Sequence, residues 1–165
     1  HLATYLGLPV VVGDASDHAD RRAQKASRHM TLYLDLTTND RLIHGLRSGA
    51  SREVRSLALP AFRHDGVLRA VEAFFHQSRT EPSAVRSLVV VSGPGRFSSL
   101  RVSATIANLF SWFQGCALYT VRGEIQGPKE TVEYLDALDA RKKHVKHVHP
   151  FYGRPPSITK PKKKS

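Results

Sequence analysis

The chain is 165 residues long and 41% hydrophobic, which is enough for one ordinary domain with a buried core. It has no run of about 18 apolar residues, so the sequence excludes a transmembrane helix. The single cysteine, Cys116, excludes an internal disulfide and is typical of a reducing compartment.

The net charge of +11 is unevenly distributed along the chain. Nine of the 25 Lys and Arg residues, and none of the 14 Asp and Glu residues, lie between residues 141 and 165. This distribution argues against a nucleic-acid-binding fold built around a basic face. Two interpretations of the basic end remain: a solubilising terminal run, or a flexible contact with RNA. The second would use Lys160, Lys162, Lys163 and Lys164.

The first elements of the chain read as three strands. We expect residues 1–29 to lie outside the fold, because the only methionine, Met30, stands directly before the first convincing strand. Alternation and β-forming residues predict strands at Thr31–Thr38, Arg41–Arg47 and Glu53–Leu59, joined by tight turns.

A helix follows at Asp65–Arg79, with apolar residues at helical spacing along one face. Phe74 and Phe75 stand side by side, which is more than one narrow stripe needs. Either the helix simply packs under the sheet, or one of the two rings belongs to the core and the other to a partner helix.

The clearest part of the sequence is a strand, a glycine turn, a helix and a second strand. The apolar run Leu88–Val91 predicts a strand buried on both faces. We expect a helix at Ser98–Gln114, with Ser98 as its N-cap and Gly115 closing it, followed by a strand at Ala117–Val121. The two strands should be parallel. Cys116, at the junction, reads as a buried structural residue.

The glycine turn itself, Gly93–Ser98, matches only half of a dinucleotide-binding motif and lacks the Lys-Ser/Thr ending of a phosphate loop. Pro94 also has no N–H to offer a phosphate. A structural turn is therefore the favoured interpretation, ahead of a partner contact or a phosphate contact. Arg101 would lie in the first helical turn, where the helix dipole disfavours a cation, so we expect it to have a partner.

Beyond this unit the signals are weaker. A helix is predicted at Lys129–Lys143. His144, His147 and His149 lie in cationic surroundings without an acidic or Cys ligand, which favours a solvated segment over a metal site. No Ser-His-Asp spacing, HExxH or CxxC is present, so we predict neither catalytic residues nor a metal.

Two segments carry a family resemblance. Gly-Pro-Gly-x-Phe-x-x-Leu-Arg-Val, at Gly93–Val102, resembles the GPGSFTGLR segment of the TsaB family, with Arg96 replacing Ser and Ser98-Ser99 replacing Thr-Gly. Val148–Pro156 resembles the closing segment of the same family, where a Pro-x-Tyr-x-Arg-x-Pro pattern is common. The resemblance covers about Thr31–Val121 together with this ending.

The resemblance implies an α/β fold: a single actin-like/ribonuclease-H-like half-domain, β-β-β-α-β-α-β, with a mixed sheet and flanking helices. It divides the chain into a TsaB-like N-terminal lobe at 30–122, a residual helical segment at 123–149 that replaces a second lobe, and a Pro/Lys-rich basic tail at 150–165. In the superfamily the first hairpin carries a phosphate-contacting loop. Asp35, Thr37 and Thr38 occupy that place here, or Asp35 caps the turn instead.

TsaB is the bacterial partner protein in making threonylcarbamoyladenosine on transfer RNA, so the resemblance implies a non-catalytic, cytoplasmic accessory subunit. It would dock on a TsaD-type paralogue through the helices of its first lobe. No cofactor is required, although ATP and magnesium could bind at the partner interface. A TsaE-type ATPase, a second copy of the chain and, indirectly, tRNA are further expected partners. The expected partner-binding residues are Phe74, Phe75, Arg101, Leu109, Phe110, Trp112 and Phe113.

Alternative interpretations belong to other classes. One is a small nucleotide-binding or nucleotide-hydrolysing enzyme of the same superfamily, which would need a second acidic phosphate loop that the sequence does not display. Another is an RNA-binding protein that acts through its basic tail alone. A third concerns the apolar helices: Phe151 and Tyr152 could anchor the C-terminal segment back over them, in place of a partner.

Overall fold

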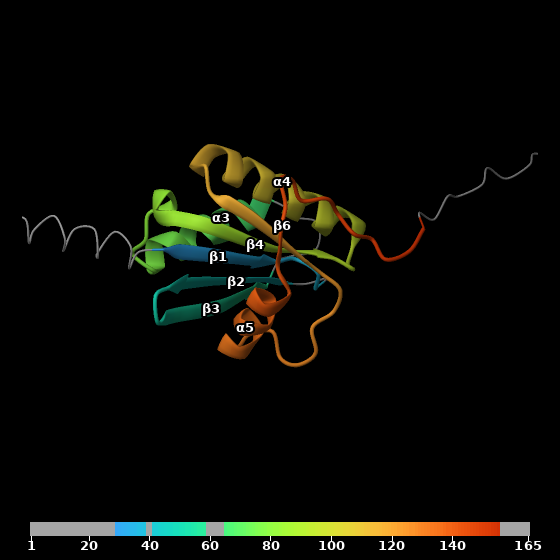
Figure 1. Cartoon of the computed structure of the whole chain (residues 1–165), viewed down its shortest axis with the longest axis horizontal. Helices are drawn as coiled ribbons and strands as arrows, with labels where there is room; N and C mark the ends of the chain where they lie inside the picture. Colours follow the sequence, from blue (N-terminus) through green and yellow to red (C-terminus); the bar gives the residue numbers. More distant parts are fainter. Residues whose placement is uncertain (1–28, 39–40, 59–64, 156–165) are drawn as a thin grey trace, which may run out of the picture.

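A computed structural model describes residues 29–38, 41–58 and 65–155 (Figure 1). The predicted order β-β-β-α-β-α-β is confirmed, and one further helix and one short strand follow it. The elements are β1 (Met30–Asp35), β2 (Arg41–Ser48), β3 (Ser51–Ala58), α3 (Asp65–Gln77), the 3-10 helix η1 (Pro82–Ala84), β4 (Val85–Gly93), α4 (Phe97–Gln114), β5 (Ala117–Arg122), α5 (Val132–Arg141) and β6 (Lys143–His144).

The strands form one mixed sheet in the order β3-β2-β1-β4-β5-β6. β1 pairs with β4, and β4 with β5, in parallel, while the remaining neighbours are antiparallel. The chain therefore makes a hairpin series at one edge and parallel crossovers in the centre. This arrangement brings the carboxyl ends of β1, β4 and β5 to the same edge of the sheet.

Helices cover both faces of the sheet. Alternation along β1 decides which side chain faces which layer. Leu32 and Leu34 belong to the core beneath α3 and α4, whereas Tyr33 belongs to the core beneath α5. The helix α5 comes close to β2 at Gly45, where an added Cβ would lie 2.9 Å from Leu135. The helix α5 therefore forms the third layer of the fold.

Two helix starts differ from prediction. Ser98 is not the N-cap of α4: the helix begins at Phe97 after Arg96, whose side chain makes no capping bond. The helix predicted from Lys129 begins only at Val132, because the Thr131 side chain accepts the backbone N–H of Tyr134 and caps it there. The predicted end of α4 is confirmed, with Gly115 in the left-handed region at φ 62°.

The chain after β6, residues 145–155, is here called the C-terminal strap, and it runs back over the end of the fold (Figure 1). The Asn108 side chain, on α4, bonds both the backbone N–H and the carbonyl of Val148. The Val148 side chain is buried, and the Phe151 N–H donates to the Ser92 carbonyl. The C-terminal segment thus returns along one side of α4, with Tyr152 on Phe97, but it leaves Trp112 and Phe113 exposed, so it does not replace a partner there as the alternative interpretation required.

Several expectations lie outside the described residues. These are the upstream segment before residue 29 and the four lysines Lys160, Lys162, Lys163 and Lys164. The proposed division of the chain into segments stays a prediction.

Cys116 is buried, as expected for a structural residue, and its burial raises the pKa of the thiol. No helix within the described ranges is long and apolar enough to cross a membrane.

His44 gives the fold a predictable acid sensitivity. It is 4% exposed in β2, its ring packs edge-on against Phe74 at 4.2 Å, and its Nδ1 finds no hydrogen-bond partner among the described residues. Burial, with a smaller contribution from the positive charge of Arg55, lowers the pKa of His44 from 6.5 to about 4. The unfolded chain therefore binds this proton more readily than the folded chain, so stability is lost as the pH falls below 6.5.

We expect the titration of His44 to lower the free energy of unfolding by about 3 kcal/mol as the pH falls from 7 to 4. Urea denaturation of the wild type and of His44→Leu over this pH range measures the effect, because the variant cannot titrate at this position. The stability difference between the two proteins should shift by about that amount in favour of the variant. Parallel pH profiles would show that His44 is not held neutral by the fold.

Candidate functional site

The most polar buried position at the carboxyl edge of the sheet is Asp35, the last residue of β1, which is 1% exposed. One carboxylate oxygen accepts the backbone N–H of Thr37 at 2.8 Å and its hydroxyl at 2.5 Å. The other oxygen accepts the Lys129 ammonium at 3.1 Å and the Tyr134 hydroxyl at 2.5 Å. Four donors thus satisfy this carboxylate from within the chain.

Lys129 supplies the counter-charge of this buried group. It lies in the loop before α5, is 28% exposed, and also donates to the Thr37 hydroxyl at 2.9 Å. Burial, reinforced by the nearby Asp35 charge, raises the pKa of Tyr134, which keeps its hydroxyl a donor. The arrangement joins the end of β1 to the loop before α5 and to α5 itself.

The three residues predicted to contact a cofactor are brought together here, but they bond to other groups of the chain. Asp35 is satisfied as described, Thr37 bonds to it, and the Thr38 hydroxyl donates to the Arg41 carbonyl. A cavity of about 210 Å³ is lined by Thr37 and Thr38, and also by Lys129, Tyr134 and the glycine turn. Cofactor binding stays a prediction. The described residues contain no cluster of three or more metal-ligating side chains.

The glycine turn is a packing junction. The Gly93 carbonyl accepts the N–H of Gly123, and Gly93 itself has φ 135°. An added Cβ there would lie 1.9 Å from the Phe151 carbonyl oxygen of the strap. An added Cβ at Gly95 would lie 3.1 Å from the Thr37 backbone. The close approach of three chain segments therefore explains the glycines without a phosphate.

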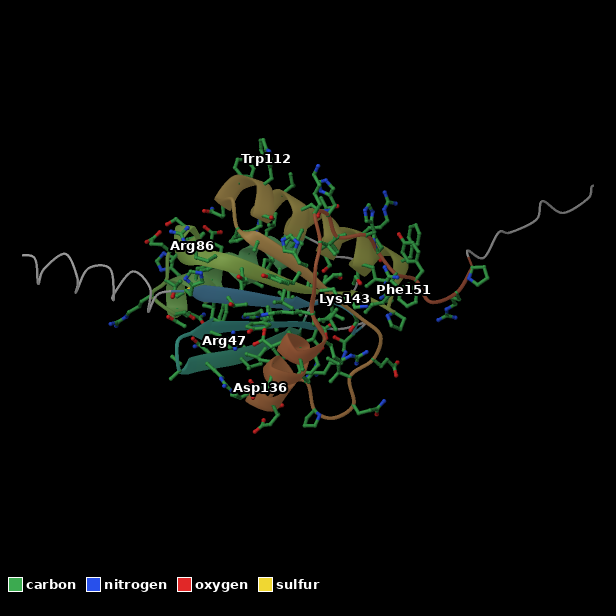
Figure 2. All side chains as sticks on the ribbon, viewed as in Figure 1. Arg47, Arg86, Trp112, Asp136, Lys143 and Phe151 are labelled. Carbon is green, nitrogen blue, oxygen red and sulfur yellow. The ribbon has the colours of Figure 1, made fainter. Side chains whose placement is uncertain are left out.

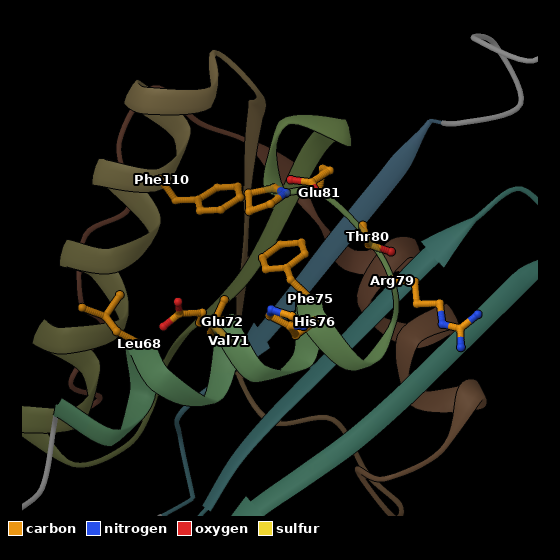
Figure 3. Close-up of a pocket in the computed structure, with 10 residues that line it drawn as sticks. Leu68, Val71, Glu72, Phe75, His76, Arg79, Thr80, Glu81 and Phe110 are labelled. Atoms are coloured by element: carbon orange, nitrogen blue, oxygen red, sulfur yellow. The ribbon is translucent and has the colours of Figure 1, made fainter.

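A groove lies between α3 and α4 on the outer side of these helices (Figure 3). Its larger hollow, of about 750 Å³, has apolar walls from Leu68, Val71 and Phe75 on α3 and from Phe110 on α4. A second hollow of about 540 Å³ continues past Leu68 along Phe97 and other residues of α4. We call both together the α3–α4 groove.

Of the two interpretations of the Phe pair, packing in the core is the one observed, and the assignment of a ring to a partner helix is wrong. Phe74 and Phe75 are both buried, so neither ring of the pair is free for a partner helix. The reason is that α3 packs in two directions: Phe74 meets His44 of the sheet, while Phe75 stacks on Phe110 of α4 at 6.1 Å. Phe75 only forms part of the groove wall.

The C-terminal half of α4 is different. Leu109 is 52% exposed, Trp112 75% and Phe113 73%. The rings of Trp112 and Phe113 touch each other edge-to-face at 4.9 Å, and Figure 2 shows Trp112 pointing away from the body of the protein. Three of the expected partner-binding residues therefore form an exposed apolar ridge on α4.

Arg101, another expected partner residue, is exposed and lies over the Phe97 ring at 5.4 Å. Its contact is an aromatic ring one turn earlier in its own helix, instead of the carboxylate or carbonyl considered from the sequence.

Sequence reasoning missed Lys129 and Tyr134 as partners of Asp35. Nothing local marks Lys129, which lies 94 residues from Asp35, whereas Tyr134 falls on the same helical face as Leu135 and Leu138.

No protein-family model matches the sequence, and no curated protein matches it either. Among solved structures, YeaZ from Pseudomonas aeruginosa has a TM-score of 0.53 and 18% sequence identity, over 57% of this chain and 44% of that chain. An uncharacterized protein with similarity to peptidase YEAZ from Pseudomonas aeruginosa gives the same TM-score and identity, over 57% and 43%. The chain has a YeaZ-like fold.

YeaZ is the TsaB protein, so the fold expected from the resemblance is confirmed, and with it the actin-like/ribonuclease-H-like class. The match spans less than half the length of the YeaZ chains. At this identity the likeness concerns the fold. The α3–α4 groove therefore lies on a YeaZ-like fold, and so does the Asp35 junction, as we call Asp35 with its partners Thr37, Lys129 and Tyr134.

The Asp35 junction yields a stability prediction. Replacing Lys129 by Met leaves the buried Asp35 carboxylate without a counter-charge, which we expect to destabilise the protein by about 3 kcal/mol. The double variant Asp35→Asn/Lys129→Met should recover part of this loss, because a neutral amide no longer needs a cation. Chemical denaturation at pH 7 measures both.

Lys142→Met is the matched control. It removes a lysine from Asp139, which keeps its ion pair with Arg47 at 2.7 Å. That change should cost less than about 1 kcal/mol. Equal losses in the two lysine variants would contradict a special role for the Asp35 junction.

Proposed function

We propose that this chain is a non-catalytic accessory subunit of the machinery that makes threonylcarbamoyladenosine on tRNA, and that it docks on a TsaD-type catalytic paralogue through α3 and α4. The observation that carries the proposal is the apolar ridge of Leu109, Trp112 and Phe113 beside the α3–α4 groove, on a YeaZ-like fold. The complex would act in the cytoplasm, on tRNA that the catalytic paralogue holds.

The size and chemistry of the exposed surface support a helical partner. Large aromatic side chains in water are costly, and clusters of them typically anchor interfaces. The groove offers an apolar floor between two helices, which suits the apolar faces of two helices from a partner in a four-helix contact. The same geometry would accept a second copy of this chain, and a TsaE-type ATPase would join the assembly elsewhere.

The Asp35 junction supports a non-catalytic role. In the proposed relationship this aspartate stands where the superfamily contacts phosphate. Here Lys129, Tyr134 and Thr37 already use its oxygens. A nucleotide that needed this carboxylate for magnesium would first have to displace the chain's own lysine from it. We therefore propose that any ATP in the assembly binds at the partner interface or on the partner.

Trp112→Glu tests the docking surface. The substitution places a charge on the apolar ridge, so complex formation with a co-expressed TsaD-type paralogue should fall at least tenfold in a pull-down or by calorimetry. Because Trp112 is 75% exposed, the monomer should keep its circular dichroism spectrum and its melting temperature within a few degrees.

Leu57→Glu is the matched control, since Leu57 is an exposed apolar residue of β3, away from the ridge, at 41% exposure. It should leave binding unchanged. Equal binding by Trp112→Glu and the wild type would move the docking surface away from α4. Unfolding of the Trp112 variant would mean that the ring is part of the monomer core.

A further inference from the structure

Four arginines and three aromatic rings gather where the strap meets the start of α4 and the end of β5. They come from three separate parts of the chain: Arg96, Phe97 and Arg101; Arg122; and Phe151, Tyr152 and Arg154. We call them the arginine–aromatic cluster. Tyr152 stacks on Phe97 with ring centroids 4.7 Å apart and an interplanar angle of 22°. Arg122 lies over the Phe151 ring at 4.8 Å, and Arg101 over Phe97 at 5.4 Å.

The charge of this cluster is not balanced by acids. All four arginines are exposed, and none forms an ion pair with a carboxylate of the described residues. The acid nearest in sequence, Glu124, is exposed and forms no ion pair within the described part either. The helix α4, which carries Arg101, contains no acidic residue at all.

The opposite side of the sheet provides the contrast. There Arg47 pairs with Asp139 and Arg52 with Asp136 of α5, each at 2.7 Å. Two arginines of the sheet are thus neutralised by acids of α5, whereas the four arginines of the cluster have no carboxylate partner among the described residues. Further exposed cations without a carboxylate partner in the described chain continue from the cluster along β6 and the strap, namely Lys143 and Lys146.

Unpaired like charges repel each other, so their accumulation at one end favours an anionic partner that supplies the missing negative charge. Arginine is suited to phosphate, because its planar fork donates two parallel hydrogen bonds to two oxygens. The rings add a second chemistry. Phe97 is 57% exposed beside the half-buried Tyr152, and exposed stacked rings are what unpaired bases bind.

We propose that the arginine–aromatic cluster binds single-stranded nucleic acid. The arginines contact successive phosphates, and a base continues the stack formed by Phe97 and Tyr152. A duplex fits less well, because its bases already stack on each other. Lys160, Lys162, Lys163 and Lys164 follow Arg154 in the sequence and lie outside the described residues. This surface is separate from the ridge on the C-terminal half of α4.

The test measures binding of a fluorescent single-stranded RNA of about 12 nucleotides by anisotropy, across a range of KCl concentrations, with the full chain. The variant Arg96→Gln/Arg122→Gln/Arg154→Gln removes three cations that do not line the α3–α4 groove. We expect its affinity to fall, and the slope of log K against log salt to decrease by about 2. Tyr152→Leu keeps an apolar contact with Phe97 but removes the stacked ring, and should lower affinity about tenfold.

The matched control is Arg69→Gln/Arg79→Gln/Arg86→Gln, which lowers the net charge equally with three exposed arginines elsewhere. Figure 2 shows Arg86 at the opposite end of the molecule from Phe151. A second comparison replaces Lys160, Lys162, Lys163 and Lys164 by Gln, which separates the tail from the cluster.

The proposal is supported if the cluster variants lose more affinity than the control, and if single-stranded RNA or DNA binds more tightly than a duplex. Equal losses in the two arginine triples would overturn it, because overall charge would then be sufficient. Loss only in the tail variant, or equal binding of poly-glutamate or anionic vesicles, would overturn it as well. Binding of the Trp112→Glu variant to a TsaD-type paralogue is measured in a different experiment. Failure of the docking proposal therefore does not imply failure of the nucleic-acid proposal, or the reverse.

Discussion

The buried carboxylate of Asp35 holds the two sides of the structure together. It ends β1, the central strand at which the antiparallel and parallel parts of the sheet meet. A carboxylate in this position would be strongly unfavourable without partners. Its partners come from Thr37, two residues on, and from Lys129 and Tyr134, more than 90 residues away. The need to neutralise this one charge therefore fixes the loop before α5, and α5 itself, on the open face of the sheet.

Once α5 is in place, the sheet is covered on both faces although the chain spans less than half the length of the YeaZ proteins. The strap completes this arrangement. It adds backbone hydrogen bonds at Ser92 and side-chain bonds at Asn108, and buries Val148 against the α3–α4 side. Because the strap follows one side of α4, the ridge at Trp112 remains uncovered. The exposed ridge is thus a consequence of where the strap runs.

Local signals predicted the elements, because apolar alternation, buried runs and glycines act over a few residues. The order of the elements along the chain, the helix end at Gly115 and the burial of Cys116 were all accessible in this way. Hydropathy left two interpretations of the Phe74–Phe75 pair open, because it does not reveal that α3 contacts both the sheet and α4. Lys129 carries no local mark of its role. The distribution of charge along the sequence was also incomplete as a guide. Counting residues assigns the excess cations to the C-terminal tail, whereas folding brings Arg96, Arg101 and Arg122 next to the strap.

The helix α4 then unites the two proposed surfaces. Its C-terminal half presents aromatic side chains, and its N-terminal end presents arginines, with no acid along its length. The unpaired N–H groups of the first turn add partial positive charge at the same end as the arginines, so the helix itself favours an anion there and not at the ridge. The two ends of α4 therefore suit different partners. An apolar helix gains nothing from the arginines at the N-terminal end, and a polyanion gains nothing from the ridge on the C-terminal half. The cluster and the ridge thus lie at opposite ends of α4, and they adjoin only through the α3–α4 groove, whose second hollow is lined by Phe97 and Arg101 of the cluster.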